Sequence, residues 1–458
     1  MQGSEAATAT DKVGIGEKIA YGLGNFGTQM IFNPATSFMV FFYTDIAGIA
    51  AATVGNLLFV SRLFDLLNPL MGMVVDKTKS RHGKARPWLL WLAIPFGLSG
   101  VLLFSTPHLG PTGKIIYAFV TYNLAFTVIY TVIDVPYSAL LPLITPDQHQ
   151  RTLLNVSRMS LANCGMILSY AVTLPLVKVL GGGATGWQRA FWIFGAAGSL
   201  LLLICFSATR ERVISATDQQ SRSVPVKAAM GALLRNPHWI LLAVFGGLLF
   251  ITLGLYGANI YFCRYFLGNQ NLFGLLMTTM IAVQVLGMIV TPSLTKRFGK
   301  RKTAMGGTLI AIAGQCLMFV GPTSFAIVMT GTVIKALGAA PCVGTMFAMI
   351  ADTVDFGEWK FGIRTDGLAY GALALVLKSC VGFGNVLVGW ILAWGGYVAG
   401  AAVQTTSALF AIKAMFLHLP LVIFVLTLVV LGMYRLDSQY SVIAADLKRR
   451  RMGDDQQH

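Results

Sequence analysis

The amino-acid sequence predicts an all-α membrane protein with about twelve transmembrane helices, arranged as two bundles of six. Of its 458 residues, 55% are hydrophobic and only 11% are charged, whereas soluble domains have about 25% charged residues. Apolar stretches of about 20 residues recur along almost the whole chain, and each can cross a hydrocarbon core about 30 Å thick as a helix. Strand-length alternation of polar and apolar residues is absent from the sequence, which disfavours a membrane β-barrel.

The expected membrane helices follow one another along the chain with one long polar interruption. They are centred near residues 30, 60, 97, 127, 166, 198, 250, 283, 312, 338, 382 and 423. The longest polar segment separates the sixth from the seventh helix. We therefore predict an N-terminal six-helix bundle over residues 1–209, a cytoplasmic middle loop over 210–238, a C-terminal six-helix bundle over 239–436 and a cytoplasmic tail over 437–458.

Basic residues are concentrated in alternate loops between the apolar stretches. They are frequent after the second, sixth and eighth stretches, whereas the loops at residues 106–110 and 181–186 contain neither Lys nor Arg. Loops rich in Lys and Arg stay in the cytoplasm according to the positive-inside rule. We therefore expect both termini to be cytoplasmic, and we attribute the net charge of +16 to membrane topology rather than to nucleic-acid binding.

A weak internal repeat relates the two halves of the chain. The loop after the second helix of the first half reads "DKTKSRHGKARPW" (76–88), and the corresponding loop of the second half reads "TKRFGKRKTAMGG" (295–307). Both are basic turns that contain glycine. Such repeats are typical of transporters in which two halves move about a binding site near the middle of the membrane.

The sequence lacks the motifs of the common enzyme classes. It contains no HExxH, GxSxG or Walker lysine loop. Its six cysteines are scattered through apolar stretches without CxxC spacing, which is typical of buried structural thiols. We therefore expect neither an enzyme nor a metal or cofactor site, apart from a coupling ion.

An aspartate stands inside the fourth apolar stretch, "YTVIDVPYSALLP" (130–142). Helical spacing places Tyr130, Thr131, Asp134 and Ser138 along one side of the helix. A carboxylate at the centre of a membrane helix costs about 2.5–3.5 kcal/mol on insertion scales, so it marks a functional site by default. The alternative is a polar stripe that only joins helices to one another.

Further polar side chains occur in other membrane helices. In "SRLFDLLNPLMG" of the second helix, Asp65 and Asn68 provide oxygen ligands on one face, suited to a small cation or a proton. Gln29 lies in the first helix, Arg158 enters the fifth and Lys378 lies in the eleventh. Together they predict a cavity lined by carboxylates, amides and cations. Lys335 in the tenth helix is either functional or a structural lysine that extends toward the membrane surface.

An acidic segment that contains Asp352 follows the tenth helix, and we expect it in a cytoplasmic loop. We predict that Asp352 closes the cytoplasmic side by pairing with a basic loop residue. The candidate partners are Arg151, Arg301 and Arg364. The alternative is a solvated surface loop, because exposed ion pairs contribute only about 0–1 kcal/mol.

Six segments in order carry a resemblance to a known family: "EKIAYGLGNFGTQ", "FFYTDIAGI", "SRLFDLLNPLMG", "VDKTKSRHGKARPWLL", "YTVIDVPYSALLPLIT" and "ADTVDFGEWKFGIRTDGLAY". With these segments the chain resembles the glycoside–pentoside–hexuronide:cation symporters of the major facilitator superfamily over nearly its whole length. The resemblance implies the major facilitator fold, a sugar bound between the two bundles, and a cation held nearby by acids of the second and fourth helices. It also implies a multi-pass protein of the bacterial inner membrane.

The resemblance assigns roles to individual residues of this chain. For coupling to a cation it implies Asp65, Asn68, Thr131 and Asp134. For substrate binding it implies Gln29, Tyr130, Asp134, Arg158 and Lys378. We expect the carrier to bind a small sugar or glycoside, a coupling cation and the lipid bilayer, to bind no nucleic acid and to function as a monomer.

The chain departs from the family pattern at positions that bear on coupling. The sugar-binding aspartate of the first helix aligns with Gln29, and the second acid of the second helix aligns with Asn68. Fewer carboxylates attract a bare cation less strongly, so we favour H⁺ over Na⁺ as the coupling ion. The alternatives are a sodium-coupled or uniport sugar carrier, a carrier of acidic, hexuronide-type sugars, and a lysolipid carrier on the same fold.

Overall fold

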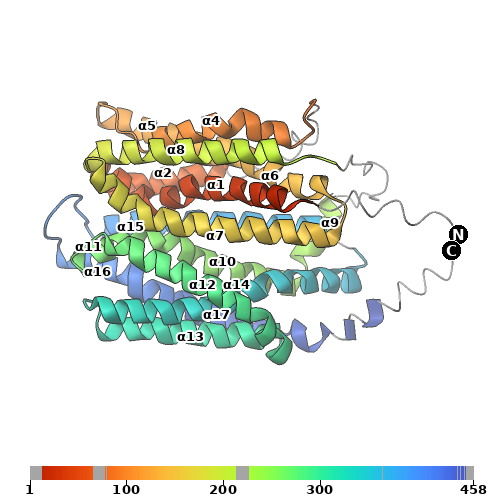
Figure 1. Ribbon diagram of the computed structural model, residues 1–458. Coiled ribbons are helices and arrows are strands. Elements are labelled where there is room, and N and C mark those ends of the chain that lie inside the picture. Colours follow the sequence, from red (N-terminus) through yellow and green to blue (C-terminus); the bar gives the residue numbers. More distant parts are fainter. Residues whose placement is uncertain are drawn as a thin grey trace. The chain divides into compact units, whose positions relative to one another are not determined.

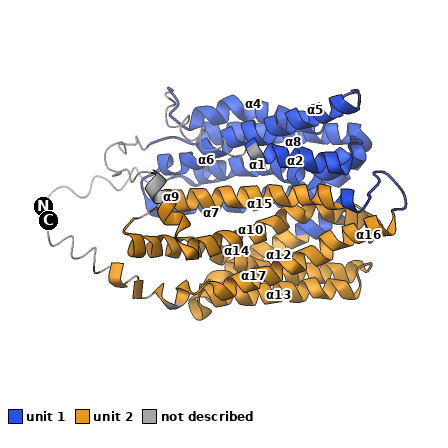
Figure 2. Cartoon of the chain, turned by 180° about the vertical axis from the view of Figure 1, so that it is seen from behind, with its two compact units in different colours: residues 1–220, 273–278, 392–404 blue, residues 221–272, 279–391, 405–458 orange. Residues whose placement is uncertain are grey.

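The computed structural model describes residues 13–64, 78, 80–212, 226–363, 365–440, 442–443, 445–447 and 449. The chain divides into two compact units, coloured separately in Figure 2. Unit 1 comprises residues 1–220 together with two short segments, 273–278 and 392–404. Unit 2 comprises residues 221–272, 279–391 and 405–458. In both units, every regular element of the described residues is a helix (Figure 1).

Unit 1 contains most of the helices of the first half of the chain. They are α1 (Ile15–Phe41), η1 (Phe42–Ile46), α2 (Ala51–Leu63), α4 (Arg86–Leu103), α5 (Pro111–Tyr122), η3 (Asn123–Tyr130), α6 (Thr131–Ile144), α7 (Gln148–Val179) and α8 (Gly183–Ala208). The elements η1 and η3 are π-helical turns. Since α5, η3 and α6 are continuous, they form one membrane-spanning stretch, Pro111–Ile144.

Unit 2 contains the helices of the second half, except for the first turns of α12 and the end of α15. The elements are α9 (Val226–Leu234), α10 (Pro237–Gly254), η4 (Leu255–Ala258), α11 (Asn259–Tyr265), α12 (Leu272–Phe298), α13 (Lys300–Val320), α14 (Phe325–Phe361), α15 (Asp366–Trp394), α16 (Thr406–Lys413), η5 (Ala414–His418), α17 (Leu419–Met433) and η6 (Leu436–Ser438). Of these, η5 is π-helical and η4 and η6 are 3₁₀ turns.

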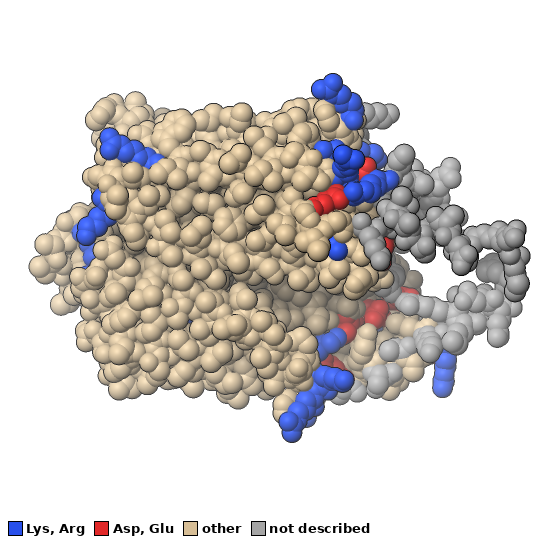
Figure 3. All heavy atoms as spheres, in the orientation of Figure 1, with Lys and Arg blue, Asp and Glu red and all other residues tan. Residues whose placement is uncertain are grey.

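The predicted fold class is confirmed. Within the described residues, ten helices are long and apolar enough to cross a membrane. The first expected span corresponds to α1, which has 27 residues. The second expected span begins with α2, and residues 65–77 lie outside the described part of the chain. The charged side chains on the visible face gather at the ends of the helices, and the helix lengths between them carry almost none (Figure 3).

One expectation about the end of the tenth span is wrong. Asp352 does not lie in a loop, because α14 continues as a regular helix to Phe361 and ends at Gly362. Gly362 adopts φ +67°, the left-handed conformation that glycine accepts at little cost, and its N–H donates to the Glu358 carbonyl. The acidic segment is therefore a helical extension of the span.

Local sequence explains where several helices begin. Asn236 accepts hydrogen bonds from the His238 and Trp239 amides at 3.1 and 3.2 Å, so it caps α10, and proline follows it at the first helical position. Asp147 accepts from the His149 amide at 2.9 Å and caps α7.

Within each unit, neighbouring helices pack closely along their lengths. Figure 1 shows α4 running beside α8, and α13 beside α17. The first pair approaches at Gly97 and Gly195, where an added Cβ on Gly195 would meet the Gly97 carbonyl oxygen at 2.7 Å. Small residues at such crossings let membrane helices gain van der Waals contact, which drives their association.

Candidate functional site

The carboxylate of Asp134 is exposed on the first turn of α6, directly after η3. Ser138, one turn further on, is exposed as well. Thr131 is buried, and its hydroxyl donates to the Phe126 carbonyl at 3.4 Å. Asp134 and Ser138 thus form the accessible polar face of this helix, whereas Thr131 binds its own backbone.

Arg158 of α7 meets this face. Its Nη1 donates to Ser138 Oγ at 3.2 Å, and its Cζ lies 5.9 Å from the centroid of the Tyr137 ring, within the range of a cation–π contact. Asp134 and Arg158 both lie within electrostatic reach of the Tyr130 hydroxyl. Four sequence positions on two helices of unit 1 therefore share one polar surface.

The Tyr130 ring connects this surface to α1. The Tyr130 ring stacks on Phe32 with a centroid distance of 4.4 Å and an interplanar angle of 20°. Gln29 lies three residues before Phe32 and is half-buried, and its Oε1 accepts from Asn33 Nδ2 at 2.8 Å. Gln29 is thus anchored on its own helix, close in sequence to the residue on which Tyr130 rests.

A pair of tyrosines that the sequence reasoning did not single out supports Arg158. Tyr21 of α1 donates to the Tyr137 carbonyl at 3.2 Å, and Tyr137 donates to the Tyr21 carbonyl. Their rings stack at 4.8 Å. A Cβ on Gly24 would approach the Tyr137 ring to 2.9 Å, so glycine there makes room for the ring. The signal in the sequence was a tyrosine in "YGLGNFG", three residues before that glycine.

Three further residues were assigned to the binding and coupling sites: Asp65, Asn68 and Lys378. Asp65 and Asn68 lie outside the described residues. Lys378 is half-buried in α15 of unit 2. Their roles stay predictions from the resemblance. Among the described residues, no group of three or more His, Cys, Asp or Glu side chains is placed to hold a metal ion.

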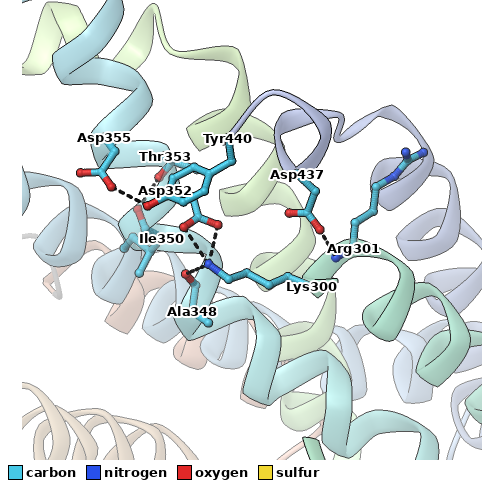
Figure 4. Close-up of polar contacts among 9 residues, drawn as sticks. All are labelled: Lys300, Arg301, Ala348, Ile350, Asp352, Thr353, Asp355, Asp437 and Tyr440. Atoms are coloured by element: carbon cyan, nitrogen blue, oxygen red, sulfur yellow. Dashed lines mark hydrogen bonds and ion pairs between the residues drawn. The ribbon is translucent and has the colours of Figure 1, made fainter. Parts of the chain in front are cut away.

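A second polar cluster lies at the end of unit 2 where α13 begins (Figure 4). The Lys300 ammonium donates to both oxygens of Asp352, at 2.6 and 2.7 Å, and to the Ala348 carbonyl at 3.2 Å. Only 3% of Asp352 is exposed. The Tyr440 hydroxyl donates to Asp355 at 2.8 Å, and burial together with the Asp355 carboxylate holds the pKa of Tyr440 above its usual value.

Two of the three expected partners of Asp352 make other contacts, with backbone carbonyls. Asp352 pairs with Lys300 and not with Arg301. Arg301 instead donates to the Leu431 and Gly432 carbonyls at 2.8 and 2.6 Å. In unit 1, Arg151 donates to the Thr145 carbonyl at 2.7 Å. Both arginines thus bind carbonyls at a helix C-terminus, where a cation is stabilised. Arg364 lies outside the described residues.

Apolar membrane helices that carry opposite charges on one polar surface are typical of secondary transporters. The family model described as MFS/sugar transport protein matches residues 20–438. The chain belongs to this family, which confirms the resemblance to the glycoside–pentoside–hexuronide symporters. It is a multi-pass membrane transporter and not an enzyme.

Curated relatives cover nearly the full chain. The isoprimeverose transporter of Lactiplantibacillus pentosus is 33% identical over 98% of this chain and 96% of the relative. The inner membrane symporter YicJ of Escherichia coli is 34% identical over 96% of this chain and 94% of the relative.

Solved structures share the fold at low sequence identity. A bacterial homologue of the human lysosomal transporter Spinster superimposes with a TM-score of 0.63 at 17% identity, covering 94% of this chain and 96% of the other. The nucleoside transporter NupG gives 0.61 at 15% identity, covering 91% and 98%. This likeness supports the fold alone.

Proposed function

We propose that this transporter imports a sugar or glycoside together with protons across the bacterial inner membrane. Family membership supports the sugar, and the isoprimeverose transporter and the symporter YicJ are the relatives that support coupled uptake. The basic loops support cytoplasmic termini. A single chain is the functional unit in this proposal.

The arrangement of Asp134 and Arg158 carries the proposal. Sugar hydroxyls both donate and accept hydrogen bonds, and a carboxylate beside a guanidinium offers both kinds of partner. Tyr130, stacked on Phe32, adds an aromatic surface next to these charges. Sites for small ligands combine apolar walls with a few placed polar groups in this way.

The coupling ion is inferred from the carboxylates available in the sequence. A cage of two acids from the second helix and Asp134 would hold three negative charges, and Asn68 reduces this number by one. A single carboxylate is sufficient to carry a proton, and Asp65 is the acid we assign to that role. A buried acid changes its protonation when its surroundings alternate between closed and open, which is how the gradient drives accumulation.

Uptake into proteoliposomes tests substrate and ion together. We expect isoprimeverose or another glycoside to be accumulated under an imposed inward proton gradient, and an equal sodium gradient to have no effect. Asp134→Asn should reduce binding at least tenfold. Asp147→Asn is the matched control, since asparagine caps a helix as well as aspartate does. Sodium-driven uptake without proton movement would contradict the proton proposal.

An acidic sugar is the second candidate, and one observation favours it. Arg158 Nε is buried and has no hydrogen-bond partner within the described structure, although a guanidinium can bind a carboxylate through two parallel bonds. A glucuronide carrier homologue and a sulfoquinovose importer are relatives at 28% and 27% identity. Tighter binding of a glucuronide than of the matching neutral glucoside, lost in Arg158→Gln, would establish this candidate over the neutral sugar.

For the cytoplasmic side we propose that Asp352 takes part in closing the carrier, and that its partner in this role is Lys300. The Lys300–Asp352 ion pair joins the start of α13 to α14 at 2.6 Å, and its acid is almost fully buried. Movement of α13 against α14 would change the geometry of this pair. The contacts of Arg151 and Arg301 support helix capping for both residues. Accessibility of a cysteine introduced at the end of α14, measured with and without Asp352→Asn, tests whether this pair closes the cytoplasmic side.

A further inference from the structure

Asp45 is an acid of the motif "FFYTDIAGI" that the proposed binding site does not use. It lies in the π-helical turn η1, which continues α1 as far as Ile46. The chain turns immediately afterwards, with Gly48 at φ +72°. Lys114 Nζ donates to the Ala47 carbonyl at 3.1 Å and fixes this turn.

The carboxylate of Asp45 gathers hydrogen-bond donors from a distant part of the sequence. The Tyr397 hydroxyl reaches Oδ1 at 2.8 Å and Oδ2 at 3.1 Å. The Gly400 amide donates to Oδ1 at 3.3 Å, and the neighbouring Thr44 hydroxyl donates to Oδ2 at 2.8 Å. Bonds to an ionised carboxylate are about twice as strong as neutral ones. Asp45 is therefore a strong attachment point for residues 397–400.

The segment Leu392–Gln404 is shaped for this contact. Gly396 and Gly400 adopt φ +70° and +75°, a conformation in which other residues are strained. Gln404 closes the loop, because its Oε1 accepts from the Val398 amide at 3.1 Å and its Nε2 donates to the Val398 carbonyl at 2.6 Å. The loop is thus held in shape by its own bonds and presents Tyr397 and Gly400 to Asp45.

The segment Leu392–Gln404 belongs to a different unit from the residues on either side of it in the chain. Leu392–Gln404 belongs to unit 1, although residues 279–391 before it and 405–458 after it belong to unit 2. Asp45 therefore holds a loop of unit 1 whose two ends continue along the chain into segments of unit 2. A charge-assisted anchor of this kind favours the one arrangement in which it is made.

We propose that Asp45 is a further functional residue of the transport cycle, whose carboxylate holds Leu392–Gln404 in one state and releases it in the next. The inference rests on the proposed transport function, since a cycle is needed for the release to matter. Asp45 lies sixteen residues after Gln29 along α1 and η1, and as a positioning residue it sets the balance between two states of the carrier.

Hydrogen exchange of the purified, substrate-free protein tests the anchor directly. We expect Asp45→Asn and Tyr397→Phe each to speed exchange of the amides of residues 396–401 about tenfold, because a lost bond to a charged group raises the opening equilibrium by that order. Tyr117→Phe is the matched control. It removes a hydroxyl of unit 1 that donates to the Leu102 carbonyl at 2.8 Å and leaves residues 396–401 unchanged.

A transport assay separates a role in the cycle from a purely structural contact. We expect Asp45→Asn and Tyr397→Phe to change the rate of uptake at least threefold while the dissociation constant for substrate changes less than twofold. The double variant should behave like either single one. Unchanged exchange, or faster exchange with unchanged uptake, would overturn the proposal. If the wild-type protein takes up no sugar, the proposed function fails, and the exchange result stands by itself.

Discussion

The fourth membrane helix of each half carries a proline with an acid eleven residues later, and the two acids are used differently. In the first half these are Pro136 and Asp147, and in the second half Pro341 and Asp352. The chain leaves α6 after Ile144, and Asp147 then caps α7. In contrast, α14 continues through Asp352, which pairs with Lys300. One position therefore serves as a cap where the helix breaks and as an ion-pair partner where it does not.

The same alignment of halves contrasts their membrane-embedded polar residues. Six residues before the proline stand Tyr130 and Lys335, and two residues before it stand Asp134 and Ala339. Asp134 is exposed, whereas Lys335 is only 9% exposed and its ammonium lies 5.6 Å from the Phe416 ring centroid. The fourth helix of the first half therefore carries an exposed polar side chain, whereas the polar side chain of the corresponding helix in the second half is buried among its neighbours.

A shared device holds the third helix in both halves. Glu211 accepts from the Lys84, Ala85 and Arg86 amides at 2.9 Å each and caps α4. Asp437 accepts from the Arg301 amide at 2.7 Å near the start of α13. The acid that follows the sixth helix of each half thus satisfies the N-terminus of the third. The two halves thus share a structural contact at the start of the third helix. They differ in the polar side chains of the fourth helix, where we expect the binding site.

Asp352→Ala should have the largest effect on stability. It leaves the Lys300 ammonium without its carboxylate, and breaking buried pairs costs about 3–5 kcal/mol. We expect about 3 kcal/mol, since the Lys300 side chain is 30% exposed. Asp147→Ala should cost only about 1 kcal/mol as a lost helix cap. Thermal unfolding of both variants in the same detergent gives the comparison, and equal losses would show that the two acids have the same role.

Glu211→Ala should rank next, at about 2 kcal/mol, because three amides lose a charged acceptor that is partly open to solvent. Asp437→Ala removes one such bond, and we expect about 1 kcal/mol. Glu211→Gln and Asp437→Asn serve as controls that keep an acceptor oxygen. A larger loss of stability in Asp437→Ala than in Glu211→Ala would contradict the interpretation that both acids act by capping the third helix.

Lys335→Met should stabilise the protein by about 1 kcal/mol. The sequence contains no Asp or Glu in residues 221–351 and 367–436, and burying an ammonium costs more than the contact with an aromatic ring returns. Exposed Lys302→Met is the control and should change stability by less than about 0.5 kcal/mol. A loss of stability in Lys335→Met would mean that the lysine holds a partner in the folded protein.

How far the sequence predicted these features depends on whether they are local. Helix positions follow from the length and hydropathy of each stretch, so the spans were predicted well. The extension of α14 was not predicted, because a cluster of acidic residues is typical of a solvated loop. The contacts of Asp352 with Lys300 and of Asp355 with Tyr440, which hold these acids in a helix, join residues that are far apart in the sequence. Likewise, a basic loop does not reveal that Lys300 turns toward α14 while Arg301 turns toward α17. Polar residues within single helices, such as Asp134, were visible because each violates its own apolar context.

Tyr440→Phe should have a small effect, and it tests the role of the second polar cluster in unit 2. The variant loses one hydrogen bond to Asp355, worth about 1 kcal/mol, and keeps the ring. Since the folded protein raises the pKa of Tyr440 above the usual value of 10.0, the contribution is complete below about pH 10 and is lost as the pH rises toward the folded value. The difference in unfolding free energy between wild type and variant should therefore be constant from about pH 7 to 9 and shrink above about pH 10. A difference that already falls below pH 9 would show that Asp355 does not hold the phenol in its protonated form.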